Sequence, residues 1–180
     1  MSIFDRNFKD IMLSQIVSIF GGLIAGTILA IYTGKVLMIP GMIILLPGFL
    51  EMRGSISGSF ASRLSSGLFL GVIKPNRKNK HIIKGNLLAS FFLVLVVTSF
   101  LGLIAFAFNY FILHSYTPKI ILFPIIAGFA ANIIEIPLTL IVTLFIFKKG
   151  HDPNNIMGPF VTSTGDITSI LALILTVLII

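Results

Sequence analysis

The chain alternates between long apolar runs and short polar or turn-rich segments. The apolar runs cover about 11–33, 36–73, 85–113, 120–147 and 155–180, and their joints include Gly34-Lys35, KPNRKNKHIIK, HSYTPK and KKGHDPNN. A helix needs about 20 apolar residues to cross a bilayer, and backbone groups in lipid must bond internally. The pattern predicts an all-α integral membrane protein with five transmembrane helices. We expect a single domain over 1–180, without a cytoplasmic regulatory domain.

The second apolar run is too long for one straight transmembrane helix. A helix over residues 36–73 would measure roughly 57 Å, against a hydrocarbon core of about 30 Å. Pro47-Gly48 is a natural place for the helix to bend or stop. We therefore predict a second helix that is kinked or broken near Pro47-Gly48.

Composition supports a membrane protein and excludes several functions. Hydrophobic residues make up 56% of the chain and charged residues 11%, less than half of the usual share of about 25%. The chain has no cysteine, which excludes disulfides and thiolate metal sites. The histidines, His81, His114 and His151, fall in separate loops, so we expect neither a histidine metal cluster nor an enzyme. The net charge of +7 is explained by membrane orientation, and we expect no nucleic-acid partner.

The basic residues predict how the chain sits in the membrane. If the N-terminus is cytoplasmic, the external joints carry only Lys35 and Lys119. Cytoplasmic segments attract Lys and Arg, and five spans put the N-terminus inside and the C-terminus outside. We therefore expect the protein in the cell membrane, with the lipid bilayer as a partner. The cytoplasmic segments then hold Arg6, Lys9, Lys74, Arg77, Lys78, Lys80, Lys84, Lys148 and Lys149.

The second run contains a polar face of small side chains. On a helix turning 100° per residue, Glu51, Ser55, Gly58 and Ser62 share one side, and Ser59 lies at its edge. A helix lying on the membrane surface would carry Lys and Arg on its polar side, and this one does not. The face suits either close helix packing or the wall of a water-filled path.

The fifth run carries an acid in the middle of the membrane. Asp166 lies roughly 18 Å beyond the cytoplasmic start of the run. An intramembrane carboxylate is a functional candidate by default, unless it pairs with an arginine such as Arg53 or Arg63. Ser59 and Ser62 lie at a similar depth. The face of Asp166 also carries Asn155, Pro159, Thr162 and Ser169, with Ser163 beside it.

The fourth run adds Glu135, with Asn132 one turn before it and Pro137 just after it. Glu135 either pairs with an arginine, or with the backbone freed by Pro137, or takes part in the pathway as a proton-coupling group. Together with Arg53 and Arg63 it forms a candidate coupling site or structural ion pair.

The chain thus offers carboxylates, hydroxyls and carbonyls, the oxygen ligands that hard cations prefer. Mg²⁺ uses one or two carboxylates and keeps several waters, and a symmetric dimer would double the acids.

Two motifs resemble one transporter family. The segments DPNNIMGPFVTSTGDIT (152–168) and EMRGSISGSFASRLSSG (51–67) are similar to the last-helix and second-helix motifs of the MgtE magnesium transporters and of their relatives, the solute carrier 41 proteins. The resemblance extends over essentially the whole chain. It implies a divalent cation channel or transporter, with Mg²⁺ as the first candidate for the transported ion and with the pore on the two-fold axis of a dimer. The partner would be an identical chain or a similar half-size subunit, because relatives fuse two such units.

The resemblance also implies roles for individual residues. Asp166 matches the principal ion ligand, and Gly54, Ser55 and Ser59 match positions usually held by Gly, Asn and Thr. Gly158 stands where bacterial members often carry a polar residue, leaving only a backbone carbonyl. The candidate ion ligands are Asp166, Ser55, Ser59, Glu51 and Thr162, and the candidate pore-lining residues are Gly58, Ser62, Gly158, Ser163 and Ser169.

A different class of function stays open at this point. In a non-transporting membrane scaffold or assembly subunit, the polar faces would hold helices together. Such a protein would pair Asp166 and Glu135 fully with arginines and leave no hydrated cavity.

Overall fold

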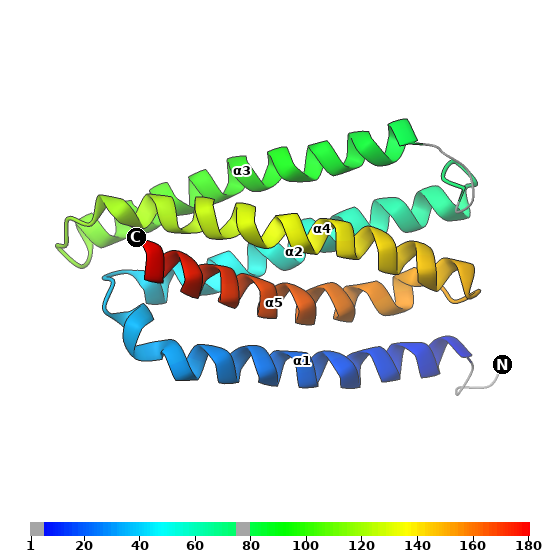
Figure 1. Ribbon diagram of the computed structural model, residues 1–180, viewed down its shortest axis with the longest axis horizontal. Helices are drawn as coiled ribbons and strands as arrows, with labels where there is room; N and C mark the ends of the chain where they lie inside the picture. Colours follow the sequence, from blue (N-terminus) through cyan, green and yellow to red (C-terminus); the bar gives the residue numbers. More distant parts are fainter. Residues whose placement is uncertain (1–5, 75–79) are drawn as a thin grey trace.

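A computed structural model describes residues 6–74 and 80–180, and these form a bundle of long helices (Figure 1). The bundle consists of α1 (Arg6–Leu37), α2 (Met42–Phe69), α3 (Lys80–Phe111), α4 (Leu122–Lys148) and α5 (Pro153–Ile179), with a short 3-10 helix, η1 (Pro118–Ile121), before α4. The all-α prediction is confirmed. Arg77 and Lys78, which entered the orientation argument, lie outside the described residues.

The helices run up and down the bundle. Helix α2 packs against α3, α4 and α5, and α5 also contacts α1 and α4, whereas α1 packs mainly against α5. In Figure 1, α1 begins at the end of the bundle opposite the one where α5 finishes. Helices α2 and α5 therefore form a central pair, and each of the other long helices packs against at least one of them.

The first turn of the chain falls a few residues later than the sequence predicted, because the expected joint at Gly34-Lys35 lies within α1. Helix α1 continues to Leu37, residues 38–41 form a turn, and α2 runs without interruption through Pro47. A second helix broken at Pro47-Gly48 is therefore wrong, and a kink there stays a prediction. Gly41 has a φ of +84°, which glycine adopts readily, and a Cβ there would overlap the side chain of Asn109. Pro47 costs α2 one backbone hydrogen bond, a loss that helices in membranes tolerate.

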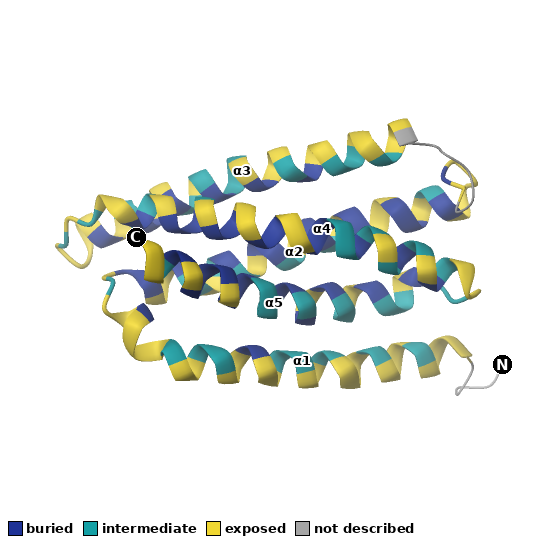
Figure 2. Ribbon diagram, viewed as in Figure 1, coloured by how far each residue is buried: buried dark blue, intermediate teal, exposed yellow. Residues whose placement is uncertain are grey.

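Apolar side chains cover much of the outside of the bundle, as expected in lipid. Many large hydrophobic residues of α1 and α3 are exposed, among them Ile19, Phe20, Phe92 and Phe100 (Figure 2). By length and composition, four helical segments of the described chain can cross a membrane: Arg6–Leu37, His81–Phe111, Pro118–Lys148 and Pro153–Ile179. Helix α2 is the exception because Glu51, Arg53 and the serines lower its hydropathy.

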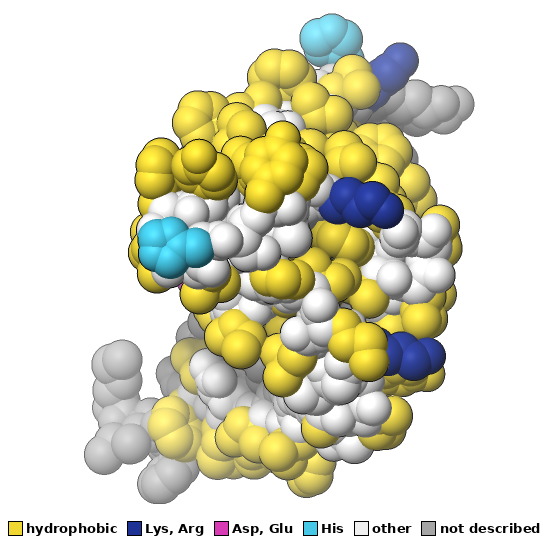
Figure 3. Space-filling model, turned by 90° about the vertical axis from the view of Figure 1, so that its left-hand side faces the viewer, with side chains coloured by type: hydrophobic (Ala, Val, Ile, Leu, Met, Phe, Trp, Pro, Cys, Tyr) yellow, Lys and Arg dark blue, Asp and Glu magenta, His cyan; other side chains and the backbone are white. Residues whose placement is uncertain are grey.

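The inside of the bundle combines an apolar core with polar side chains. Phe49, Phe60 and Leu64 of α2 are fully buried in the core. Arg53, Asn132, Glu135 and Ser169 are buried as well, at the contacts of α2, α4 and α5. At the end of the bundle shown in Figure 3, lysine and histidine side chains lie among hydrophobic ones. The molecule thus places its polar groups in the α2–α4–α5 contacts and at its ends.

Candidate functional site

Asp166 faces an open hollow between α2 and α5. The hollow has a volume of about 510 Å³, and Asp166 and Thr162 line it from α5. Its α2 side is formed by Pro47, Leu50, Glu51, Gly54 and Ser55. The structure therefore brings together four of the five candidate ion ligands, Asp166, Glu51, Ser55 and Thr162.

Local geometry explains why this hollow is open and rich in oxygen. Gly54 leaves space, because a Cβ built on it would meet nothing within 4 Å. The Ser55 hydroxyl lies 3.5 Å from Glu51 Oε1, one helical turn away on the same face. Thr162 donates its hydroxyl proton to the carbonyl of Gly158 at 3.1 Å, which leaves the lone pairs of its oxygen available. The polar atoms at the hollow are thus mainly oxygens.

A second, smaller hollow continues along the same two helices. It measures about 200 Å³ and lies toward the start of α5, where Asn154, Met157 and Gly158 face α2. The residues of α2 that line it are Gly58, Ala61, Ser62 and Ser65. Three of the five candidate pore-lining residues, Gly58, Ser62 and Gly158, therefore share this hollow, and the two hollows follow one side of the α2–α5 pair.

The remaining candidates point elsewhere. Ser59 accepts a hydrogen bond from Arg63 at 3.3 Å and donates to the carbonyl of Ile56. Ser163 is buried beneath α1, where Gly21 lies against it. Ser169 is buried and accepts a hydrogen bond from Arg53 Nε at 3.3 Å. Ser163 and Ser169 thus lie in helix contacts, whereas Ser59 is exposed and bonds within α2, and none of the three lines either hollow.

Arg53 is engaged inside the bundle. The guanidinium donates from Nη1 to Asn132 Oδ1 at 2.8 Å and from Nε to Ser169, so it joins α2 to α4 and α5. Arg63 instead donates to Asn86 Oδ1 at 3.0 Å and to Ser90 at 3.2 Å, both on α3. Among residues 6–74 and 80–180, neither arginine forms an ion pair with Asp166. The arginine pairing expected of a scaffold is not formed at this acid.

Glu135 has a different environment from Asp166. It is fully buried and accepts hydrogen bonds from Thr164 at 3.0 Å and from Thr168 at 3.4 Å, both on α5. The positive charge of Arg53 attracts it across the same interior. Thr164 and Thr168 were not among the predicted site residues, although their i, i+4 spacing places them on one face toward α4. Glu135 fastens α4 to α5.

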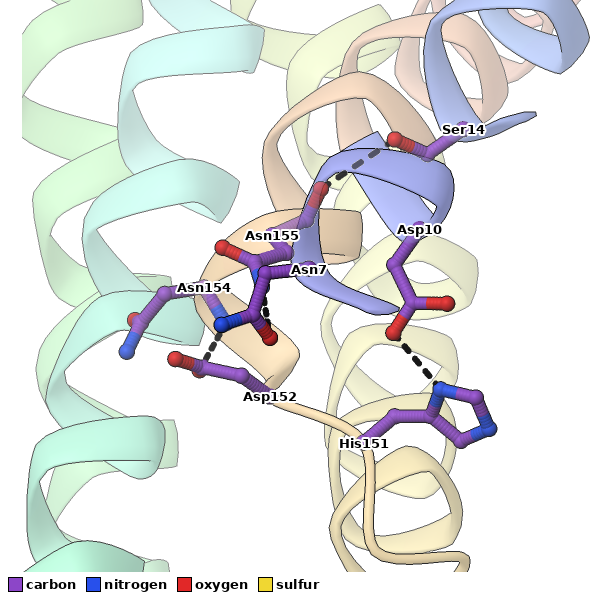
Figure 4. Close-up of polar contacts among 7 residues, drawn as sticks. All are labelled: Asn7, Asp10, Ser14, His151, Asp152, Asn154 and Asn155. Atoms are coloured by element: carbon purple, nitrogen blue, oxygen red, sulfur yellow. Dashed lines mark hydrogen bonds and ion pairs between the residues drawn. The ribbon is translucent and has the colours of Figure 1, made fainter. Parts of the chain in front are cut away.

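Polar contacts also hold the start of α1 against the start of α5 (Figure 4). His151 Nδ1 lies 2.7 Å from Asp10 Oδ2, and Asn155 Nδ2 donates to Asn7 Oδ1 at 3.2 Å. Ser14 donates to the carbonyl of Asn155, and Asp152 caps α5 by accepting from the backbone N–H of Asn154. These contacts fix the start of α5 against α1.

The chemistry of the larger hollow suits a hard, hydrated cation. Its two carboxylates, Glu51 and Asp166, lie with hydroxyl oxygens, the ligands that Mg²⁺ and Ca²⁺ prefer. In the described parts of the chain, no three His, Cys, Asp or Glu side chains gather into a metal cluster. A cation here would keep much of its water, as Mg²⁺ usually does.

A comparison with known families matches residues 46–176 to MgtE, a divalent cation transporter. The match covers most of the chain and includes both hollows. The chain therefore belongs to the MgtE family of divalent cation transporters, and with its apolar helices it is a multi-pass membrane protein. Searches of curated proteins and of solved structures gave no match.

Proposed function

We propose that the chain forms one half of a dimeric pathway for divalent cations, with Mg²⁺ as the transported ion. The hollow of Glu51, Ser55, Thr162 and Asp166 is open on one side of a single chain. A second copy, or a similar half-size subunit, placed on this side by a two-fold axis would supply a second set of oxygens. The pathway would then be lined by both chains and would act as a channel or as an ion-coupled transporter.

The observation that carries this proposal is the position of Asp166. A carboxylate inside a membrane bundle is costly unless it has a partner or a function. Arg53 and Arg63 are engaged with other residues, while Asp166 faces a hollow that water and a cation can enter. Asp166 is therefore the proposed main ligand, and Glu51, Ser55 and Thr162 assist it directly or through water.

The proposed membrane arrangement has five spans in the cell membrane, with the N-terminus inside. Two arguments support it. Helix α1 begins and α5 finishes at opposite ends of the bundle, as an odd number of passes requires (Figure 1). Lys74, Lys84, Lys148 and Lys149 belong to the helix ends on the side where α1 begins, which fits the positive-inside rule. Helix α2 crosses with its polar side covered by protein or facing the water-filled pathway.

The experiment that tests the function is Mg²⁺ uptake into proteoliposomes. We expect Asp166→Asn, which keeps the shape and removes the charge, to reduce the uptake rate at least tenfold, because Mg²⁺ depends on carboxylate ligands. Asp10→Asn makes the same chemical change at the end of α1, outside both hollows, and should keep most of the uptake.

Both proteins are reconstituted to equal amounts, and the folded fraction is checked in detergent before reconstitution. Uptake by the Asp166→Asn protein at the wild-type rate would remove Asp166 from the mechanism. If wild type transports no divalent cation when reconstituted alone, the homodimer is incorrect and a second subunit is required.

A further inference from the structure

A large cavity lies away from the α2–α5 hollows, at the other end of α5. It has a volume of about 780 Å³ and is formed where the α1–α2 turn, the segment before α4 and the last turns of α5 meet. The lining is mostly apolar and includes Met38, Ile39, Phe123, Val177 and Leu178. The proposed conduction pathway does not use this cavity.

Two lysines stand at the mouth of this apolar cavity. Lys35 lies in the last turn of α1 and Lys119 lies in η1, and both side chains are exposed. Lys35 Nζ lies 6.0 Å from the centre of the Tyr32 ring, and Lys119 Nζ donates to the backbone oxygen of Ile180 at 3.3 Å. Within the described residues, no Asp or Glu side chain lines the cavity. An apolar cavity with two cations at its mouth complements a ligand that has an apolar tail and an anionic head.

The walls of the cavity are built into the fold. Asn109 of α3 is fully buried, and its Nδ2 donates to the carbonyl of Pro40 at 2.7 Å and to Thr117 Oγ1 at 2.6 Å. One side chain thus ties the α1–α2 turn to the segment before α4. Gly41 allows this contact, because a Cβ there would overlap Asn109. The two lysines are consequently held on elements whose relative positions are fixed.

We propose that this cavity binds an anionic phospholipid of the surrounding bilayer. An acyl chain would occupy the apolar interior, and the phosphate would lie beside Lys35 and Lys119. Both lysines belong to helix ends, at the level where lipid head groups begin, and the end of the molecule shown in Figure 3 carries a few basic side chains among many hydrophobic ones. Thr117, already tied to Asn109, and Tyr116 add hydroxyl groups at the mouth. In the proposed orientation, this lipid belongs to the outer leaflet.

The absence of tryptophan from the sequence allows a direct test. Tyr116→Trp introduces one fluorophore at the cavity, and phospholipids with brominated acyl chains quench it on contact. In mixed vesicles, brominated phosphatidylglycerol is compared with brominated phosphatidylcholine. We expect an apparent preference for phosphatidylglycerol of about 25-fold, because each of the two lysines near an anionic lipid surface contributes roughly fivefold.

Matched variants decide whether the cavity causes this preference. The preference should fall to about one when Lys35→Gln and Lys119→Gln are added, and should persist when Lys148→Gln and Lys149→Gln are added at the other end of the molecule. Phe92→Trp places the reporter on the lipid-exposed face of α3, where we expect no preference. Equal quenching by the two lipids at residue 116, or a preference that survives the loss of Lys35 and Lys119, would overturn the proposal.

A second readout does not depend on the reporter. Phosphatidylglycerol added to wild-type protein in detergent should raise its Tm more than phosphatidylcholine does, since a ligand of the folded state stabilises it. The difference should vanish in the Lys35→Gln, Lys119→Gln protein. If Tyr116→Trp fails to fold, Met38→Trp is the alternative reporter in the same cavity.

Discussion

At the scale of single residues, Asp166 and Glu135 are both carboxylates within the helical bundle, yet their neighbours give them different roles. Glu135 is enclosed by Thr164 and Thr168 and is attracted by Arg53. Asp166 faces an open hollow instead. A group with satisfied partners in a packed interior holds helices together, whereas a carboxylate exposed to a water-accessible hollow remains available to a cation.

The attraction between the charges of Arg53 and Glu135 predicts a coupled loss of stability. Arg53→Met removes the positive charge and leaves Glu135 buried, so the free energy of unfolding should fall by about 3–5 kcal/mol. Glu135→Gln keeps an oxygen acceptor for one of the two threonines and removes the buried charge, so it should cost less. The double variant should be more stable than the sum of the single effects by about 1–3 kcal/mol, because no unpaired charge remains.

Unfolding in detergent measures this double-mutant cycle. Strictly additive losses would show that Arg53 and Glu135 do not stabilise each other. Mg²⁺ uptake by Glu135→Gln, corrected for the folded fraction, should stay near that of wild type. A loss of uptake without a loss of folded protein would favour the proton-coupling role of Glu135 over the structural one.

At the scale of elements, the contact of α1 with α5 depends on close approach of the two backbones. The first helix carries a face of small residues, but its glycines differ in their surroundings. A Cβ on Gly21 would lie 2.5 Å from Ser163 Cβ, whereas a Cβ on Gly22 or on Gly26 would meet nothing within 4 Å. Only one of these three glycines is therefore required by packing against α5.

This difference predicts opposite effects for neighbouring substitutions. Gly21→Ala should lower stability by about 1–3 kcal/mol, because α1 must move away from Ser163. Gly22→Ala should leave stability unchanged or raise it by up to about 1 kcal/mol, since alanine favours a helix more than glycine does. Thermal unfolding in detergent compares the two proteins. Equal Tm values would mean that α1 does not need this contact with α5.

The sequence predicted the helices well and the turn between the first two poorly. Hydrophobic runs separated by turn residues identify long helices because the bilayer requires both length and apolar character. The first turn was expected at Gly34-Lys35 and lies at residues 38–41, and the break considered at Pro47-Gly48 does not occur, although Pro40-Gly41 and Pro47-Gly48 look alike in sequence. Only the tertiary contact of Gly41 with Asn109, together with its positive φ, distinguishes the turn from a proline inside a helix.

For the candidate site, helical periodicity predicted which residues share a face of one helix, but not which neighbouring helix each face contacts. Periodicity placed Glu51 and Ser55 on one face and Thr162 with Asp166 on another, and the structure brings these faces to one hollow. Periodicity alone could not place Ser163 against Gly21, because the sequence does not show which neighbouring helix covers a residue at the edge of a face. The Ser59–Arg63 hydrogen bond, in contrast, joins residues four apart on α2. The network of Asn109 was missed, since a single asparagine in an apolar run carries no periodic signal.

At the scale of the whole molecule, the absence of cysteine makes the proposed orientation testable. A single cysteine at His114 should react with a membrane-impermeant maleimide in intact cells. One at Lys149 should react only after the membrane is opened. The reverse pattern would invert the orientation and place the cavity near Lys35 and Lys119 in the inner leaflet.

The proposed dimer makes a prediction for the whole molecule, because one chain lines only one side of the proposed pathway. Thr162 is exposed on that side, next to Asp166. In the cysteine-free chain, Thr162→Cys should therefore form an inter-chain disulfide under mild oxidation in membranes. Phe92→Cys on the outer face of α3 is equally accessible and should stay monomeric on a non-reducing gel. Cross-linking at residue 92 and none at residue 162 would place the contact between chains on α3 and leave the hollow of Asp166 facing lipid, where a hydrated cation could not enter.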